Sequence, residues 1–277
     1  MILRKYYKIF RVALIERLTY RSDFLLSSAL RLLPMVTTIL LWSAVYAGAG
    51  RDSTASDGDK QIAGYRLPEM IAYLLLVHIS RMFSSMPGLA AAIALDIREG
   101  TLKKYLLQPL DMLGYLITYR VAHKIAYIVT SFLPYAALFA LCSSYFERLP
   151  NAETWAVYLL SLVLAFVIGF YFEACIGMIG FWMLEVTSLL YIVNTLNYFI
   201  SGQMFPIDLL PAPVVRALKL LPFSYMAYFP AAVFLGKIEG PALWTGLAGA
   251  AAWAVGLFVF ARVLFRLGVR RYSAYGG

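Results

Sequence analysis

The chain has 277 residues, of which 62% are hydrophobic and only 14% are charged. Soluble domains carry about 25% charged residues, so the composition excludes an ordinary water-soluble protein. The net charge of +9 does not indicate a nucleic-acid partner, because the basic residues are dispersed between apolar runs instead of forming a basic domain.

The first 23 residues have the pattern of an amphipathic helix. Apolar residues recur at spacings of three and four, and an adjacent stripe is basic. A helix of this kind lies along a membrane surface, and packing against other protein is the alternative. The apolar set is Leu3, Tyr7, Phe10, Leu14 and Leu18, and the basic set is Arg4, Lys8 and Arg11.

Residues 24–277 contain six apolar stretches separated by short polar segments. A transmembrane helix needs about 20 predominantly apolar residues. The sequence therefore predicts an all-α, polytopic membrane protein with one domain of six transmembrane helices. The predicted spans are approximately 24–48, 68–95, 113–145, 155–184, 186–205 and 243–265.

The distribution of Lys and Arg predicts the orientation of these spans. Short cytoplasmic loops are enriched in Lys and Arg. With the N-terminus inside, 13 of them flank the inner ends of the spans and seven flank the outer ends. Both termini are therefore expected to be cytoplasmic.

Residues 96–110 form a predicted inner segment that mixes charged and apolar side chains. Gly100 can end the preceding helix and Pro109 can fix the start of the next span. A short amphipathic helix between them would place charges on one face and Leu102, Tyr105 and Leu106 on the other, which suits docking to a soluble partner. An interfacial connector without a partner is the alternative.

Residues 206–236 are rich in proline but too apolar for a solvated loop. Irregular backbone at membrane depth requires protein or a water-filled cavity to satisfy its polar groups. We therefore expect short re-entrant helices that enter the bilayer from its outer face.

At these segments the sequence resembles the type-2 ATP-binding-cassette permeases, and within them a bacterial subfamily of six-span permease subunits. The resemblance rests on IREGTLKKYLLQPL (Ile97 to Leu110), SGQMFPIDLLP with LPFSYMAYFP (Ser201 to Pro230) and RRYSAYGG (Arg270 to Gly277). It covers nearly the whole chain.

The resemblance implies a function for each segment. Residues 96–110 look like the coupling helix that seats on an ATPase subunit, and residues 206–236 look like the outer helices that gate or cap the exit. The coupling residues would be Asp96, Arg98, Glu99, Gly100, Thr101, Leu102 and Tyr105. The outer residues would be Gly202, Pro206, Asp208, Pro222 and Phe223.

The resemblance also implies the partners and the location. Two permease chains, identical or homologous, would meet face to face above two cassette ATPase subunits in the bacterial plasma membrane, with the second and fifth spans lining the path. The chain contains no G-x-x-x-x-G-K-[ST] motif. ATP and Mg²⁺ are therefore expected on the partner, and this chain is expected to bind no cofactor or metal and to have no enzyme activity of its own.

Ionisable residues at membrane depth are costly and are functional candidates by default. His78 and Arg81 share a face of the second span, and Glu173 lies on a small-residue face of the fourth span. We expect Glu173 to pair with Arg81 or Lys124, with substrate contact as the alternative. Asn194, Asn197 and Ser201 form one polar stripe on the fifth span, which could line the path or hydrogen-bond across a subunit interface.

These patterns favour a permease subunit of an exporter driven by ATP hydrolysis. An intramembrane lipid-modifying enzyme is an alternative, but it would need clustered carboxylates, histidines or metal ligands near one face. The inner carboxylates Asp96, Glu99 and Asp111 are instead interleaved with basic residues. A membrane scaffold without transport activity is a third reading.

The predicted orientation can be tested with a reporter fused to the C-terminus of the full chain. An enzyme that is active only in the cytoplasm should be active in this fusion, because the basic residues hold both termini inside. An enzyme active only outside the cytoplasm should give no signal. The opposite result would exclude this topology.

Overall fold

The computed structural model describes residues 2–19, 21–49, 61–62, 64–108, 110–146, 150–183 and 185–272. Most of the predicted loop at residues 51–61, Pro109 and the last residues of the RRYSAYGG motif lie outside the described residues, as does the side chain of Arg31.

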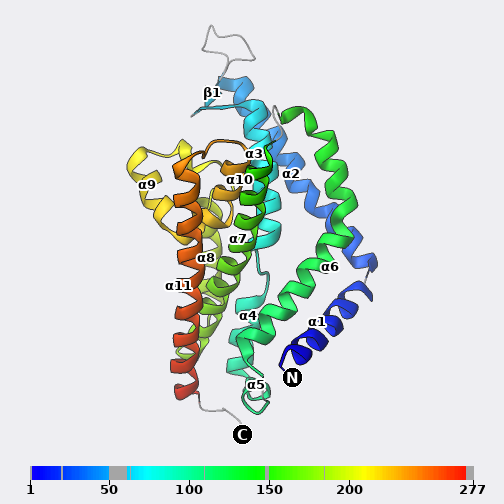
Figure 1. Cartoon of the computed structure of the whole chain (residues 1–277), viewed down its shortest axis with the longest axis vertical. Coiled ribbons are helices and arrows are strands. Elements are labelled where there is room, and N and C mark those ends of the chain that lie inside the picture. Colours follow the sequence, from blue (N-terminus) through cyan, green and yellow to red (C-terminus); the bar gives the residue numbers. More distant parts are fainter. Residues whose placement is uncertain are drawn as a thin grey trace.

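The described chain is almost entirely helical (Figure 1). Two short antiparallel strands, β1 (Gln61–Ile62) and β2 (Tyr65–Arg66), are the exception among the described residues. The longer helices are α1 (Ile2–Thr19), α2 (Arg21–Ala49), α3 (Leu67–Ser84), α4 (Leu89–Arg98), α6 (Met112–Leu141), α7 (Ala152–Met178), α8 (Thr187–Ile200) and α11 (Pro241–Arg271). The shorter ones are α5 (Lys103–Leu106), α9 (Ala212–Leu220), α10 (Tyr228–Phe234) and the 3₁₀ helices η1 (Ser143–Tyr145), η2 (Ile179–Phe181), η3 (Ile207–Leu209) and η4 (Pro222–Met226).

Among the described residues, four helical stretches are long and apolar enough to cross a membrane: Leu67–Arg98, Met112–Leu141, Ala152–Phe181 and Pro241–Arg271. A shorter apolar stretch, Leu33–Gly48, lies within α2. The α8 helix has 14 residues and is about 21 Å long at 1.5 Å per residue, which is less than the ~30 Å hydrocarbon core. Because the described chain contains several helices that can each cross a bilayer, the protein is a helical, multi-pass membrane protein.

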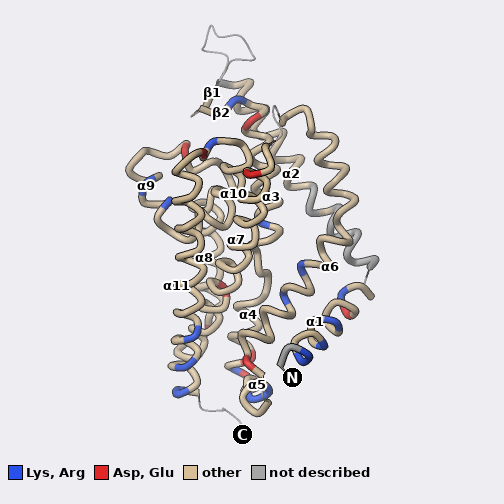
Figure 2. The backbone as a smooth tube through the Cα atoms, viewed as in Figure 1, with Lys and Arg blue, Asp and Glu red and all other residues tan. Residues whose placement is uncertain are grey.

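The two ends of the bundle differ in charge. The start of α1, the α4–α5 turn and the end of α11 lie at one end, which we call the terminal end (Figure 1). The strands, α9 and α10 lie toward the other, which we call the distal end. Lys and Arg gather at the terminal end, over α1, α5 and the last turns of α11 (Figure 2). The start of α1, the end of α11 and the α4–α5 turn thus share one end of the bundle.

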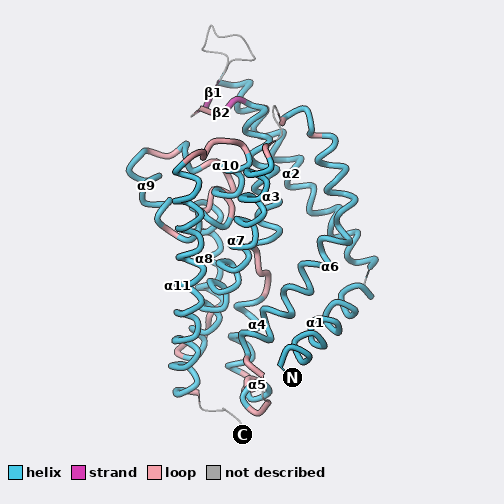
Figure 3. The backbone as a smooth tube through the Cα atoms, viewed as in Figure 1, coloured by secondary structure: helices cyan, strands magenta, loops and turns pink. Residues whose placement is uncertain are grey.

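The predicted second span is not one continuous helix. It is split into α3 and α4 by residues 85–88, which Figure 3 shows as a loop within the bundle. Pro87 has no backbone N–H and disfavours helix at the preceding residue, and Gly88 has a φ of 73°. The sequence predicts one continuous span over 68–95 because the residues remain apolar on both sides of the break, so hydrophobicity alone does not reveal it.

The α7 helix is the centre of the fold and packs against α3, α4, α10 and α11. In the most apolar 18-residue window of Ala152–Phe181, 56% of the residues are buried within the protein. The corresponding share for α6, at the periphery, is 17%. The glycines of α7 explain the close packing: a Cβ at Gly169 would overlap the backbone oxygen of Ser84, and a Cβ at Gly177 would lie 2.7 Å from the oxygen of Ala90. The small-residue face of α7 therefore holds the two halves of the broken span.

The short segments between α8 and α11 fold back onto this core. Every residue of α10 is buried, and the helix packs against α3 and α7. The prediction of short helices in place of a solvated loop matches this arrangement.

The α1 helix packs along α6, with Ala13 buried between them. Nη2 of Arg17 donates a hydrogen bond to the hydroxyl of Tyr119 at 3.2 Å. Tyr7, Val12 and Ile15 remain exposed, so α1 has one face on protein and a second apolar face that is not covered by the described chain.

We expect Gly169→Ala to destabilise the full chain by about 1–3 kcal/mol, a typical cost of overpacking, because the added methyl group meets backbone that cannot rotate away. Gly256→Ala in α11 is the matched control, since a Cβ there meets nothing within 4 Å. Helix propensity should make that variant up to about 1 kcal/mol more stable. Thermal unfolding in detergent measures both, and equal melting temperatures would contradict the proposed packing.

Candidate functional site

The turn between α4 and α5 is held by Asp96. The hydroxyl of Thr101 donates to Oδ1 of Asp96 at 2.6 Å, and Nζ of Lys104 lies 2.9 Å from the same oxygen. Gly100 has a φ of 74°, a conformation that favours glycine. The turn is therefore a fixed structure that projects from the terminal end of α4.

Electrostatics reinforce this turn. Partial burial lowers the pKa of Lys104, but its hydrogen bond to Asp96 and the neighbouring negative charge outweigh burial and raise the pKa overall. Lys104 therefore stays charged at neutral pH and keeps its ion pair with Asp96.

The apolar side chains of this segment divide into two groups. Leu102 is fully buried in the core, and Tyr105 is half-buried with its ring 5.5 Å from that of Tyr115. Leu106 and Leu107 are 43% and 83% exposed. The expectation that Leu102 faces a partner is corrected, because the Gly100 turn directs this side chain inward. Leu107 is the exposed apolar residue that the sequence analysis did not select.

Two ion pairs link the ends of the coupling segment to other helices. Nη1 of Arg98 lies 3.5 Å from Oε2 of Glu185, next to the start of α8. Arg262 of α11 pairs with Asp111, which also caps α6 by accepting a hydrogen bond from the N–H of Gly114 at 2.6 Å. Glu185 and Arg262 cannot be recognised as the partners of Arg98 and Asp111 from sequence, because the paired residues are far apart in the chain.

Two cations of α6 bind the backbone at the break between α3 and α4. Nζ of Lys124 donates to the carbonyl oxygens of Met82 at 2.5 Å and Ser85 at 2.6 Å. Nη1 of Arg120 donates to the carbonyl oxygen of Pro87 at 3.1 Å. A broken helix leaves carbonyl groups without intrahelical partners, and these side chains replace the missing donors.

The predicted ion pair of Glu173 is not a direct contact. Glu173 interacts electrostatically with Arg81 and Arg120, but among the described residues no ion pair within 4.0 Å joins it to Arg81. The guanidinium of Arg81 has one weak hydrogen bond, to the hydroxyl of Ser84 at 3.5 Å. Arg81 and Glu173 therefore interact electrostatically over a longer distance, and direct pairing of Glu173 stays a prediction.

Arg81 lines a cavity of about 140 Å³ between α2, α3 and the end of α8, which we call the membrane groove. His78 lies beside it and is 3.0 Å from the hydroxyl of Tyr135. Tyr198 and Gln203 close the groove on the side of α8. The apolar lining is Pro34, Met35, Leu74 and Val77. The groove brings the predicted path residues of the second span together with Tyr198 and Gln203 of the predicted fifth span.

The polar stripe of α8 divides between inside and outside. Asn197 and Ser201 are buried, whereas Asn194 is exposed. Gln203 donates to the hydroxyl of Ser201 at 2.7 Å, while Oδ1 of Asn197 is buried and has no hydrogen-bond partner in the part of the chain that the structure describes. The sequence pattern did not identify Gln203, because it follows a left-handed turn at Gly202 that ends the helical register.

The distal end is held by a polar network around Asp208. Its Oδ2 accepts hydrogen bonds from the hydroxyls of Tyr65 at 3.1 Å and Tyr228 at 2.7 Å, and its Oδ1 lies 3.2 Å from Nζ of Lys219. Burial raises the pKa of Tyr65 and Tyr228, and the charge of Asp208 raises it further. Both phenols therefore remain protonated donors.

The other predicted outer residues belong to the same structure. Gly202 is buried, and its carbonyl oxygen accepts a hydrogen bond from Tyr73 at 2.7 Å. Pro206 and Pro222 are buried, and the ring of Phe223 packs edge-on against Phe172 at 5.1 Å. This segment is thus an integral cap on α3 and α7.

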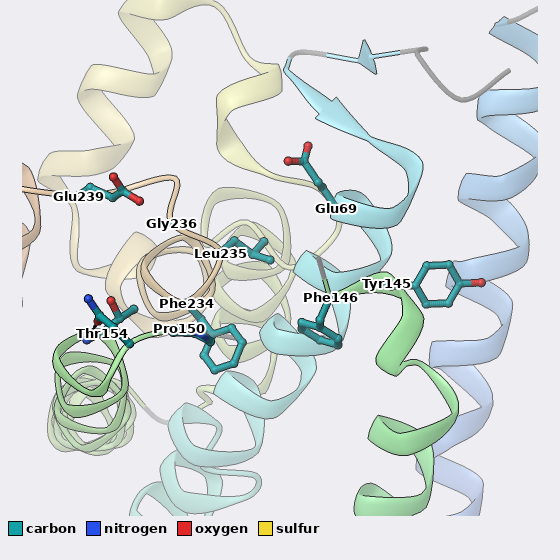
Figure 4. Close-up of a pocket in the computed structure, with 10 residues that line it drawn as sticks. Glu69, Tyr145, Phe146, Pro150, Thr154, Phe234, Leu235, Gly236 and Glu239 are labelled. Atoms are coloured by element: carbon teal, nitrogen blue, oxygen red, sulfur yellow. Dashed lines mark hydrogen bonds between the residues drawn. The ribbon is translucent and has the colours of Figure 1, made fainter. Parts of the chain in front are cut away.

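A second, larger cavity of about 490 Å³ opens at the distal end (Figure 4). It lies between the start of α3, η1, the start of α7 and the end of α10. Glu69 and Glu239 border it from opposite sides, and Glu69 is paired with Lys237 at 3.0 Å. Phe146 and Phe234 form its apolar wall.

A comparison with models of known protein families identifies the family of this chain. The family model described as "ABC-2 family transporter protein" matches residues 32–276, nearly the whole chain. The chain belongs to the ABC-2 transporter family. A search of the curated proteins found no match. The family match confirms the resemblance inferred from sequence, and makes this protein a transmembrane permease component of an ABC transporter.

We expect Lys124→Met to destabilise the permease, because it leaves the carbonyls of Met82 and Ser85 without their donor. An unsatisfied buried polar group costs about 1–3 kcal/mol. Lys103→Met, on the exposed side of α5, is the control and should change stability by less than about 0.5 kcal/mol. Thermal unfolding of the full chain compares them, and a Lys124 variant as stable as the control would show that these contacts contribute nothing.

Proposed function

We propose that this permease exports a substrate across the bacterial plasma membrane, using ATP that a separate cassette ATPase hydrolyses with Mg²⁺. The observation that carries the proposal is the rigid, charged turn at residues 96–107, which presents Leu106 and Leu107 at the terminal end. An exposed leucine flanked by charges suits a groove on a soluble partner.

The contacts of this turn provide a route from the ATPase to the membrane helices. Leu102 anchors the turn in the core formed with α7 and α11. The Arg98–Glu185 pair joins it to the start of α8, and the Asp111–Arg262 pair joins it to α11. A displacement of the turn would therefore act on α4, α8 and α11 together.

The proposed topology has six crossings with both termini and the coupling turn in the cytoplasm. The excess of Lys and Arg at the terminal end supports this orientation (Figure 2). The fifth crossing consists of α8 and the turns that follow it to Phe205. On this topology η3, α9, η4 and α10 are re-entrant helices on the outer side, and residues 1–23 lie at the inner surface.

A second permease chain, identical or homologous, would face α8. This helix has few contacts within the chain and exposes a row of apolar side chains: Tyr191, Ile192, Leu196, Tyr198 and Phe199. The translocation path would then run between the two chains, along α3 and α8.

Coupling can be tested by purifying the tagged permease from its native host and measuring ATP hydrolysis in the complex. A cassette ATPase should co-purify. Leu107→Ser and Glu99→Arg should reduce both the recovered ATPase and its activity, because they alter the exposed face of the turn. Leu220→Ser is the control: Leu220 is 75% exposed but lies on α9 at the distal end.

Absence of an ATP-hydrolysing partner from the wild-type complex would exclude the proposal. Normal recovery and activity in both turn variants would exclude this turn as the docking surface. A defect in the Leu220 variant equal to theirs would indicate a general effect of exposed leucines.

A further inference from the structure

We propose that the membrane groove binds an amphipathic anion, a molecule with one anionic head group and a hydrophobic body, with the head group on Arg81. As an assignment of substrate class it rests on the proposed transport function, whereas the binding itself can be measured without the ATPase.

Arg81 places a positive charge in the groove. Arg81 carries five N–H donors in a planar fork that matches phosphate or carboxylate oxygens. In the described chain its single direct hydrogen bond is the 3.5 Å contact to Ser84, and no Asp or Glu oxygen lies within 4.0 Å of it. A guanidinium at membrane depth is costly unless it has a partner, and an anionic ligand would supply one.

The surroundings of Arg81 are positive overall. Lys124 and Arg120 reach the backbone just after Arg81, at residues 82–87. Among the residues that the structure describes, Glu173 is the carboxylate that interacts with Arg81. Glu173 belongs to α7 and does not line the groove. The described charges nearby thus favour a ligand of negative charge.

The position and walls of the groove indicate that the ligand is amphipathic. Arg81 is 14 residues beyond Leu67, about 21 Å along the helix, so the cation lies well within the hydrocarbon core. Pro34, Met35, Leu74 and Val77 form an apolar wall beside it. A volume of about 140 Å³ holds a head group and the first carbons of a chain, and the rest of the hydrophobic body would extend along α2 and α8.

A further polar side chain lies next to the guanidinium. Tyr198 lines the groove from α8, and its hydroxyl can contact another oxygen of a phosphate or carboxylate group. The amide N–H groups of Gln203 are donated to the carbonyl oxygen of Asn197 and to the hydroxyl of Ser201, and His78 is bonded to Tyr135, so the proposed site relies on Arg81 for the anionic head group.

Native mass spectrometry of the full chain, purified in a zwitterionic detergent, tests the proposal with defined probes. The two anionic amphiphiles are phosphatidylglycerol, which represents a bilayer lipid, and dodecyl phosphate, which represents a free amphiphile. Inorganic phosphate is a control that has the anionic group without a hydrophobic body. Phosphatidylcholine is a control that has the hydrophobic body without a net negative charge. We expect one molecule of at least one anionic amphiphile per chain, and no saturable binding of the other two. The anionic probe that binds more tightly identifies the source of the ligand.

Three substitutions identify the site. Arg81→Gln should weaken binding by about tenfold or more, the loss of one charged hydrogen bond, and Arg81→Lys should weaken it less. Arg266→Gln removes the same charge from an exposed position on α11 and should have no effect. Glu173→Gln should strengthen binding, because it removes the competing negative charge.

The outcomes separate ligand binding from a structural role. Absence of binding by both anionic amphiphiles, or equal binding by the Arg81→Gln and Arg266→Gln variants, would overturn the proposal. If the Gln variant does not fold, the Lys and Glu173 variants decide: unchanged affinity in both would overturn it. A chain that binds the anion but recovers no ATPase would keep this site and exclude the proposed coupling.

Discussion

The need to satisfy backbone polar groups inside the bilayer governs this structure. Carbonyl groups freed by a helix break have no water to bind in the hydrocarbon core. Here the break at residues 85–88 is tolerated because Lys124 and Arg120 of α6 donate to three of the carbonyl oxygens around it. These contacts fix α6 against α3 and allow α3 and α4 to be separate helices within one crossing.

The same break explains the packing of α7. Its glycines let the backbone of both halves approach closely, with Gly169 against Ser84 and Gly177 against Ala90. Close approach of backbones stabilises helix pairs in membranes, where hydrophobic burial alone does not drive association. The central helix therefore holds the α3 half, which carries Arg81, and the α4 half, which leads to the coupling turn.

Polar contacts fix the structure at both ends of the permease. At the terminal end, Arg98 and Asp111 tie the coupling turn to α8 and α11. At the distal end, Asp208 of η3 and its tyrosine partners join α10 to β2, which directly precedes α3. The membrane groove lies between these two fixed regions, bordered by α3 and by α8.

The sequence by itself determined the class of protein and four of its long apolar helical stretches, because long apolar runs are visible without a structure. It also placed short helices in the segment that follows α8, because proline and glycine act locally. It also identified Arg81 and Glu173 as half-buried charges within apolar helices, since ionisable residues in apolar runs are visible without a structure. Only the tertiary structure decided the partners: Lys124 donates to the carbonyl oxygens of Met82 and Ser85, Leu102 is buried while Leu107 is exposed, and Gln203 joins the groove. Those outcomes depend on contacts between helices far apart in the chain, and no local pattern encodes them.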